Sequence, residues 1–178
     1  MKWVYLGFYR NIVKTYFCKQ ILLVKFFAMK FYVDTSVWGG NFDKEFSEDT
    51  IPFFHEARQG KFKIVLSDVT ISELQNAPLK VRELPATISA NFLELVNIDE
   101  EHLALADKYI SEGALSTKFY SDAQHIALAT ILKVESLVGW NFKHMVNFFR
   151  IRQYNSINLK YGYSTIDIRT PKEITYGD

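Results

Sequence analysis

The stretch KFYVDTSVW at residues 30–38 decides the fold of this chain. Residues 31–33 are strong β-formers, Asp34 stands where the strand should stop, and two hydroxyl residues, Thr35 and Ser36, follow at once. In an open parallel α/β sheet, ligands bind beyond the carboxyl ends of the strands, so Asp34 predicts a functional site at that edge. Asp, Ser and Thr are also common helix N-caps, and on this stretch alone the capping interpretation stays open.

Length and composition set the broad class. A chain of 178 residues corresponds to one domain, with room for an appendage, and it can bury a sizeable core. With 48% hydrophobic and 16% aromatic residues the composition is that of a globular protein. The single cysteine, Cys18, excludes an internal disulfide framework and a cysteine-based zinc site. We therefore expect a cytoplasmic protein.

Residues 1–28 differ in composition from the remainder. They contain five Lys and Arg side chains and no acid, whereas the rest carries 16 basic and 20 acidic side chains. Polar residues interrupt the apolar run, so the segment has no clean stretch of about 20 residues for a spanning helix and fits a signal peptide poorly. We interpret it as upstream sequence translated before a start at Met29. The alternatives are an extra packed helix and a basic amphipathic segment that touches a membrane or nucleic acid.

From Met29 onward, strand and helix patterns alternate, and we expect one domain over residues 29–178 with no membrane contact. The predicted strands lie at 31–33, 62–66, 92–98, 136–140 and 165–169. The predicted helical segments lie at 47–59, 67–77, from 80 onward, 100–112, 121–133 and 143–158. Strands separated by helices imply βαβ crossovers. The sequence therefore predicts a three-layer α/β/α fold with a mostly parallel central sheet of about five strands.

Polar oxygen-bearing residues follow this scaffold at its strand-end edge. Asp34 ends the first strand, and Glu73 lies in the helix after the second. Asp122 opens the helix before the fourth strand, and Asn141 follows that strand. These positions do not form a local motif, so only the fold can bring them together.

Clustered carboxylates call for a cation. Oxygen ligands of this kind suit Mg²⁺, and also Mn²⁺, which bind through one or two carboxylates and keep several waters. Without a cation the carboxylates would repel one another. A divalent ion relieves that repulsion, positions a water and stabilises the charge that develops on a phosphodiester.

Four motifs carry a family resemblance: VDTS at 33–36, SELQN at 72–76, SDAQHIALA at 121–129 and GWNFKHMVN at 139–147. In this order and spacing they resemble the PIN domain, especially the bacterial and archaeal VapC-type toxins of type II toxin–antitoxin pairs. The resemblance covers about residues 29–169.

The resemblance implies a Mg²⁺-dependent endoribonuclease that hydrolyses RNA phosphodiester bonds. It places Asp34, Glu73 and Asp122 at the three acidic metal-site positions, with Asn141 completing the catalytic set where many members have a fourth acid. It also implies a homodimer, an RNA substrate and a cognate antitoxin as partner. Two residues depart from the family pattern: Asn141 offers a neutral oxygen, and Gly139 stands where the family often has a small hydroxyl residue. Both departures affect the expected rate of catalysis.

Other residues are candidates for substrate contact, each with a simpler interpretation. Thr35 and Ser36 could bind a phosphate or water beside Asp34, or cap the next helix. Trp38 could stack on a base, although packing is commoner for a lone aromatic. His125 and His144 could donate to phosphate, although solvated or capping histidines are commoner.

Rival classes fail on the same residues. A haloacid-dehalogenase-like phosphatase needs a second acid two residues after the first, where this chain has Ser36, and residues 34–40 lack the Gly-rich turn of a dinucleotide-binding fold. The alternative that stays open is a PIN-like protein that binds RNA or an antitoxin with weak or no nuclease activity. Local basic residues, Lys143, Arg150 and Arg152, are the candidates for an RNA groove.

Overall fold

The fold is organised by five short, apolar strands, and the computed structural model describes it over residues 29–175. The strands form one sheet in the order β3-β2-β1-β4-β5, and every neighbouring pair is parallel. Their bounds are Lys30–Val33 (β1), Lys63–Ser67 (β2), Leu93–Val96 (β3), Ser136–Val138 (β4) and Ile168–Arg169 (β5). The predicted parallel α/β sheet of about five strands is confirmed. The basic lead at 1–28 lies outside the described residues.

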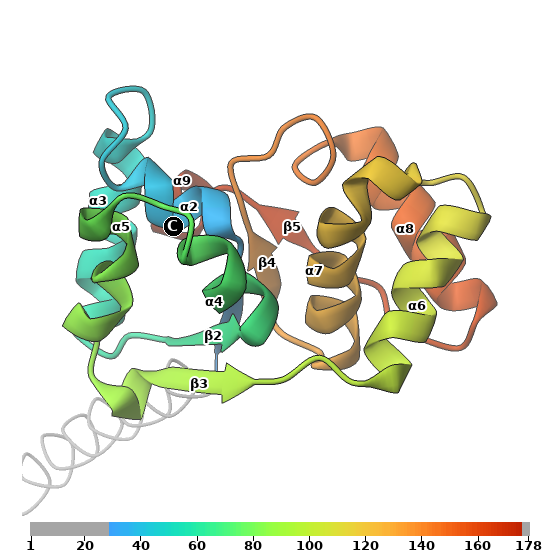
Figure 1. Ribbon diagram of the computed structural model, residues 1–178, viewed down its shortest axis with the longest axis horizontal. Coiled ribbons are helices and arrows are strands. Elements are labelled where there is room, and N and C mark those ends of the chain that lie inside the picture. The colour runs from blue at the N-terminus through green and yellow to red at the C-terminus, as the bar shows by residue number, and fades with distance from the viewer. Residues whose placement is uncertain (1–28, 176–178) are drawn as a thin grey trace, which may run out of the picture.

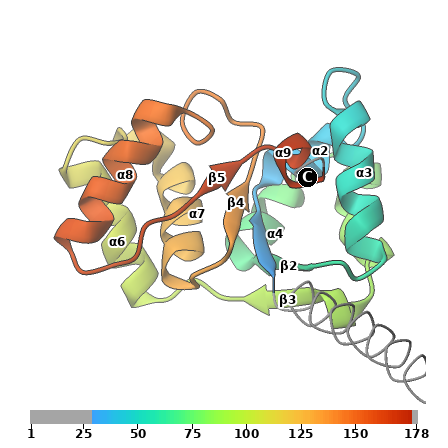
Figure 2. The same ribbon diagram turned by 180° about the vertical axis from the view of Figure 1, so that it is seen from behind.

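Helices cover both faces of the sheet, as Figures 1 and 2 show from opposite sides. On one face lie α6, α7 and α8, and on the other lie α3, α5 and α9. The helices are Thr35–Gly40 (α2), Ser47–Arg58 (α3), Asp68–Leu74 (α4), Leu79–Arg82 (α5), Glu100–Ser111 (α6), Tyr120–Ile131 (α7), Phe148–Lys160 (α8) and Pro171–Thr175 (α9). Short 3₁₀ turns lie at Leu84–Thr87, Ala90–Phe92 and Thr117–Phe119.

Strand alternation produces two separate cores. In β1, Tyr32 faces the core under α6, α7 and α8, whereas Phe31 and Val33 face the core on the α3 side. Because successive side chains of a strand point to opposite faces, a strand buried on both sides reads as a continuous apolar run. This is why the sequence KFYV identified β1 without showing any polar alternation.

One predicted helix was wrong at its start. The sequence suggested a helix from residue 143, but α8 begins at Phe148, because Asn147 is its N-cap and accepts hydrogen bonds from the backbone N–H groups of Phe149 and Arg150. Residues 139–147 are therefore a loop that follows β4 and runs along the carboxyl edge of the sheet. Phe148 and Phe149, in the first turn of α8, are 66% and 76% exposed.

Among the helices of residues 29–175, none is long and apolar enough to cross a membrane.

Candidate active site

Asp34 occupies the position that the sequence predicted, at the end of β1. Its backbone N–H donates to the Val138 carbonyl at 2.9 Å, which places it level with the end of β4. Its Oδ2 accepts hydrogen bonds from the backbone N–H of Ser36 at 3.0 Å and from the Ser36 hydroxyl. The Asp34 side chain is buried and caps α2, while its Oδ1 lies near His125 and Glu73. Capping and site interpretations therefore both apply to this residue.

Glu73 reaches the same edge from the last turn of α4 and is held by three side chains. Its Oε2 accepts from the Thr35 hydroxyl and from His125 Nε2 at 3.1 Å, and its Oε1 accepts from the Ser121 hydroxyl. Burial alone would raise the pKa of Glu73, but the hydrogen bond and charge of His125, with the Ser121 and Thr35 hydroxyls, lower that pKa to about 2. Glu73 is thus a firmly ionised carboxylate in a fixed orientation.

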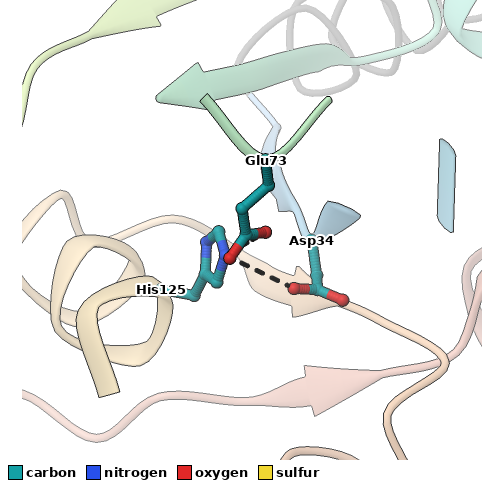
Figure 3. A group of neighbouring side chains, drawn as sticks. All are labelled: Asp34, Glu73 and His125. Carbon is teal, nitrogen blue, oxygen red and sulfur yellow. Dashed lines mark hydrogen bonds and ion pairs between the residues drawn. The ribbon is translucent and has the colours of Figure 1, made fainter. Parts of the chain in front are cut away.

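His125 is the buried link between the acids and the core. Its Nε2 lies 3.7 Å from Asp34 Oδ1, and its Nδ1 lies 2.7 Å from the Tyr32 hydroxyl, which in turn lies 2.6 Å from Ser67 Oγ. Figure 3 shows Asp34, Glu73 and His125 pointing toward one another. Burial alone would lower the pKa of His125, but Tyr32, Glu73 and Asp34 raise it well above its ordinary value of 6.5. Both ring nitrogens have partners inside the protein and the side chain is 1% exposed, so the ring is not solvated, and its donation to phosphate stays a prediction.

Asp122 lies in the first turn of α7 and has fewer donors. Asn141 Nδ2 donates to Asp122 Oδ1 at 3.2 Å, while Asn141 Oδ1 accepts from the His144 backbone N–H at 3.0 Å. Burial, followed by the charge of Asp34, raises the pKa of Asp122 to about 6. The structure therefore brings all four predicted polar residues to one edge, with Asp122 electrostatically coupled to Asp34 and Glu73.

The donor set fits a small, hard cation. Asp34, Glu73 and His125 each offer one atom within 4.8 Å of the others. Because the pKa of His125 is raised and its Nε2 already bonds Glu73, the imidazole is better suited to holding that carboxylate than to ligation. Asp122 is the neighbouring carboxylate, and burial and the charge of Asp34 oppose its ionisation. Three oxygen-bearing acids at one edge match the ligands that Mg²⁺ and Mn²⁺ prefer.

Gly139 leaves room next to Asp34. A Cβ at this position would lie 3.6 Å from Asp34 Cβ and 3.8 Å from Asp34 Oδ2, which is ordinary van der Waals contact. A serine side chain could therefore stand beside the carboxylate without displacing it.

Two side chains predicted to contact substrate, Trp38 and His144, are buried. Trp38 is 0% exposed and packs with its ring centroid 4.8 Å from that of Phe54, so the base-stacking prediction for Trp38 is wrong. It lies in α2, where Val37 and Gly40 are buried as well. His144 is buried against the Phe119 ring at a centroid distance of 3.8 Å, and burial together with Lys143 and Arg150 lowers its pKa. Neither side chain is exposed where a base or a phosphate could contact it.

Sequence reasoning missed the hydroxyl support of Glu73 from Ser121 and the partnership of Tyr32 with His125. Ser121 directly precedes Asp122 at the start of a predicted helix, where a cap is the ordinary interpretation of a serine. Tyr32 sits in an apolar strand, where its hydroxyl gives no signal of a distant partner. Thr35 and Ser36 do stand beside the acids, each bonded to one of them.

Residues 31–138, from β1 to β4, match the PIN domain family. No curated protein matches the chain. Among solved structures, the chain is similar to one in the crystal structure of VapBC2 from Rickettsia felis bound to a DNA fragment from their promoter. That similarity has 15% identity and a TM-score of 0.49, and it covers 80% of this chain and 98% of the other.

Proposed function

The chain belongs to the PIN domain family, and from this premise we propose that it is a divalent-metal-dependent endoribonuclease that hydrolyses RNA phosphodiester bonds. The observation that carries the proposal is the convergence of Asp34, Glu73 and Asp122, which are far apart in the sequence, with burial and the charge of Asp34 raising the pKa of Asp122 to about 6. A fold that holds mutually repelling carboxylates at an edge where ligands bind has a use for a cation there.

The side chains divide the work between ligation and support. Asp34, Glu73 and Asp122 would hold Mg²⁺ or Mn²⁺ directly or through water. Ser36 fixes the Asp34 carboxylate through two hydrogen bonds, and His125 fixes Glu73. When bound, the ion would lower the pKa of a water and offset the charge that develops on the phosphodiester. Asn141 orients Asp122 with its amide N–H group and supplies a neutral oxygen.

We assign the partners from the same family resemblance. The protein would act in the cytoplasm as the toxin of a toxin–antitoxin pair, as a homodimer that a cognate antitoxin protein inhibits. The motif at residues 139–147, which resembles that of VapC-type toxins, supports this assignment.

A second candidate is a PIN-like protein that binds RNA or an antitoxin and cuts weakly or not at all. The observation that favours it is Asn141, whose amide donates a hydrogen bond to Asp122 where an acid would add a charged metal ligand. Weak cation binding would then limit catalysis, while the surface around the acids would be unchanged.

The test is cleavage of a structured RNA pool by the purified full chain with Mg²⁺, with EDTA, and with the variants Asp34→Asn and Asp122→Asn. We expect metal-dependent cutting that each substitution reduces at least about 100-fold. Glu100→Gln, at an exposed acid that starts α6, is the matched control and should cut like the wild type. Cutting that persists in EDTA or in both acid variants would reject the metal site at these acids, and absent cutting by the wild type with Mg²⁺ would reject the nuclease assignment.

A further inference from the structure

Tyr32 carries a buried hydroxyl to which the proposed chemistry gives no role. The residue lies in β1, is 0% exposed, and packs in the core under α6, α7 and α8. A phenylalanine would fill nearly the same space without bringing a polar group into that core. Because a buried hydroxyl costs free energy unless it is hydrogen-bonded, the partners of this hydroxyl show what the position needs.

The Tyr32 hydroxyl joins two helices through one oxygen atom. It lies 2.6 Å from Ser67 Oγ and 3.3 Å from Thr70 Oγ1, and on its other side 2.7 Å from His125 Nδ1. Ser67 ends β2 and is the N-cap of α4, where its Oγ accepts from the Thr70 backbone N–H at 3.1 Å. His125 belongs to α7. Tyr32 therefore connects the start of α4 to α7.

The same two helices meet again at the acids. Glu73 lies near the end of α4, and His125 Nε2 donates to its Oε2 at 3.1 Å. The contacts close a ring that runs from Tyr32 through His125 to Glu73 and returns along α4 to Ser67. Because α4 has only seven residues, one imidazole and one hydroxyl fix both of its ends.

The directions of these hydrogen bonds explain why the ring contains a hydroxyl. An ionised carboxylate only accepts, so the proton between His125 and Glu73 lies on Nε2. In a neutral imidazole Nδ1 then needs a donor, whereas in an imidazolium Nδ1–H needs an acceptor. A hydroxyl can be either, so Tyr32 holds the His125 ring in one orientation in both states. Phenylalanine offers neither a donor nor an acceptor.

His125 differs from the other two donors to Glu73 in how it is held. Thr35 and Ser121 are half-buried, and each donates through a single hydroxyl that can rotate. His125 is 1% exposed and approaches Glu73 from the core, with its second ring nitrogen already bonded to Tyr32. The core therefore sets the direction of the His125 donor, and Tyr32 is the polar group through which it does so.

We propose that Tyr32 is a positioning residue of the metal site: it holds the His125 ring so that Nε2 points at Glu73, and thereby fixes the Glu73 carboxylate as a ligand for Mg²⁺ or Mn²⁺. The inference rests on the proposed function and adds to it a residue that touches neither the ion nor the RNA. Removing a group that orients a metal ligand commonly lowers metal affinity by about 10- to 100-fold. Because Thr35 and Ser121 would still hold Glu73, we expect the lower end of that range.

The test is a titration of the purified full chain with Mn²⁺ in the absence of RNA, with the free ion measured by its electron paramagnetic resonance signal. Tyr32→Phe removes the hydroxyl and keeps the ring, and it should raise the Mn²⁺ concentration at half-saturation about tenfold. In the cleavage assay the same variant should need about tenfold more Mg²⁺ for its half-maximal rate, while its KM for RNA at saturating Mg²⁺ stays at the wild-type value.

Tyr109→Phe is the matched control. Tyr109 is also 0% exposed in the same core, and its hydroxyl bonds Asn158 at 2.6 Å and Thr130 at 3.3 Å, outside the acidic site. Each variant loses the hydrogen bonds of one buried hydroxyl, so both should lower the Tm. Only Tyr32→Phe should also shift the Mn²⁺ titration, which a purely structural role would not do.

Half-saturation by Mn²⁺ that stays within about twofold of the wild type in Tyr32→Phe, or that rises as much in Tyr109→Phe, would overturn the positioning role. A wild-type chain that binds no Mn²⁺ would overturn it as well. Failure of the nuclease assignment has a different signature, because the wild type with Mg²⁺ would then leave RNA uncut while the Mn²⁺ titration still reports on Tyr32.

Discussion

The two halves of the acidic edge solve the same electrostatic problem differently. In the Glu73 half, which comprises Glu73, Thr35, Ser121 and His125, three side chains donate to one carboxylate. In the Asp122 half, which comprises Asp122 and Asn141, one amide donates to one carboxylate. The pKa of Glu73 is lowered to about 2, because its donors outweigh burial, whereas burial and Asp34 raise the pKa of Asp122 to about 6.

This difference locates the need for a cation. The Glu73 half is neutralised by the protein itself, through an imidazole buried against Tyr32. The positive group that lowers the pKa of Asp122 is His125, which already bonds Glu73 in the other half. Glu73 is ionised and held by its donors, whereas burial and the charge of Asp34 oppose the ionisation of Asp122. Such a site favours a ligand that brings positive charge next to Asp122.

The largest effect is expected from removing the neutralising group of the Glu73 half. His125→Ala would leave the ionised Glu73 without its charged partner, remove the partner of the Tyr32 hydroxyl and open a cavity at a position 1% exposed. We expect the free energy of unfolding to fall by about 3 kcal/mol, measured by urea denaturation with EDTA present.

His55→Ala is the matched control for that experiment. His55 is exposed on α3, and among the hydrogen bonds described for its ring the partner is Gln59, the C-cap of that helix. Its removal should change the free energy of unfolding by less than about 0.5 kcal/mol. If His125→Ala were as mild as His55→Ala, the Glu73 half would not depend on an internal cation.

The next comparison neutralises one acid in each half. Without metal, Asp122→Asn should raise the Tm, because it removes a charge whose burial is opposed, whereas Glu73→Gln should lower the Tm, because it weakens the contact with His125. Both groups are partly exposed, so solvent screening limits each effect to about 1 kcal/mol, or about 3 °C in Tm. Differential scanning fluorimetry with EDTA measures both, and shifts of the same sign would contradict the division into two halves.

Added Mg²⁺ supplies the control for these two variants. It should stabilise the wild type, because it binds the native state and offsets the carboxylate charges, and it should stabilise Asp122→Asn much less.

A smaller effect follows from pH. The pKa of Asp122 is about 6 in the folded chain against an ordinary 3.8, so the folded state binds more protons between these values and stability falls as pH rises from about 4 to 6. Glu73 has the opposite shift, and its contribution is fully present above pH 4.5 and lost only as pH falls toward 2.

The Tm advantage of Asp122→Asn over the wild type, measured with EDTA, should therefore be present at pH 7.5, smaller at pH 5 and largely gone at pH 4. His125 also loses its stabilising contribution as pH rises above 6.5 toward its raised pKa, but this change is shared by both proteins and cancels in the difference. An advantage that is constant with pH would show that Asp122 ionises normally.

The sequence predicted the positions of the acids better than their surroundings. Asp34 and Asp122 stand at element ends that hydrophobic patterns and capping residues identify locally, so their placement at one edge followed from the parallel fold. The role of His125 depends on Tyr32, which is in a different element and is distant in the sequence, so no local pattern could reveal it.

The predicted start of a helix at residue 143 was wrong for a related reason. Apolar residues from 143 onward have helical spacing, but Asn147 is the N-cap, so α8 begins at Phe148. Earlier in the same loop, Trp140 contacts Thr50 of α3 and Gly40 of α2. Trp38 was a candidate for stacking by its place just after a strand, but it is buried in α2. Burial at an element end is a tertiary property that spacing alone does not determine.

The smallest effect is expected from adding a second acid to the Asp122 half. Asn141→Asp would replace the amide that donates to Asp122 by a second carboxylate, which removes a hydrogen bond and adds a like charge. With EDTA the free energy of unfolding should fall by about 1 kcal/mol or less, because residue 141 is partly exposed. With Mg²⁺ or Mn²⁺ the change should reverse, since the new carboxylate is a charged ligand, and the metal concentration needed for half-maximal stabilisation should drop several-fold. Asn97→Asp, at an exposed asparagine after β3, is the control and should leave the metal dependence unchanged. If Asn141→Asp instead weakened metal-dependent stabilisation, the amide N–H donated to Asp122 would matter more than charge, and the Asp122 half would be organised for hydrogen bonding rather than for a cation.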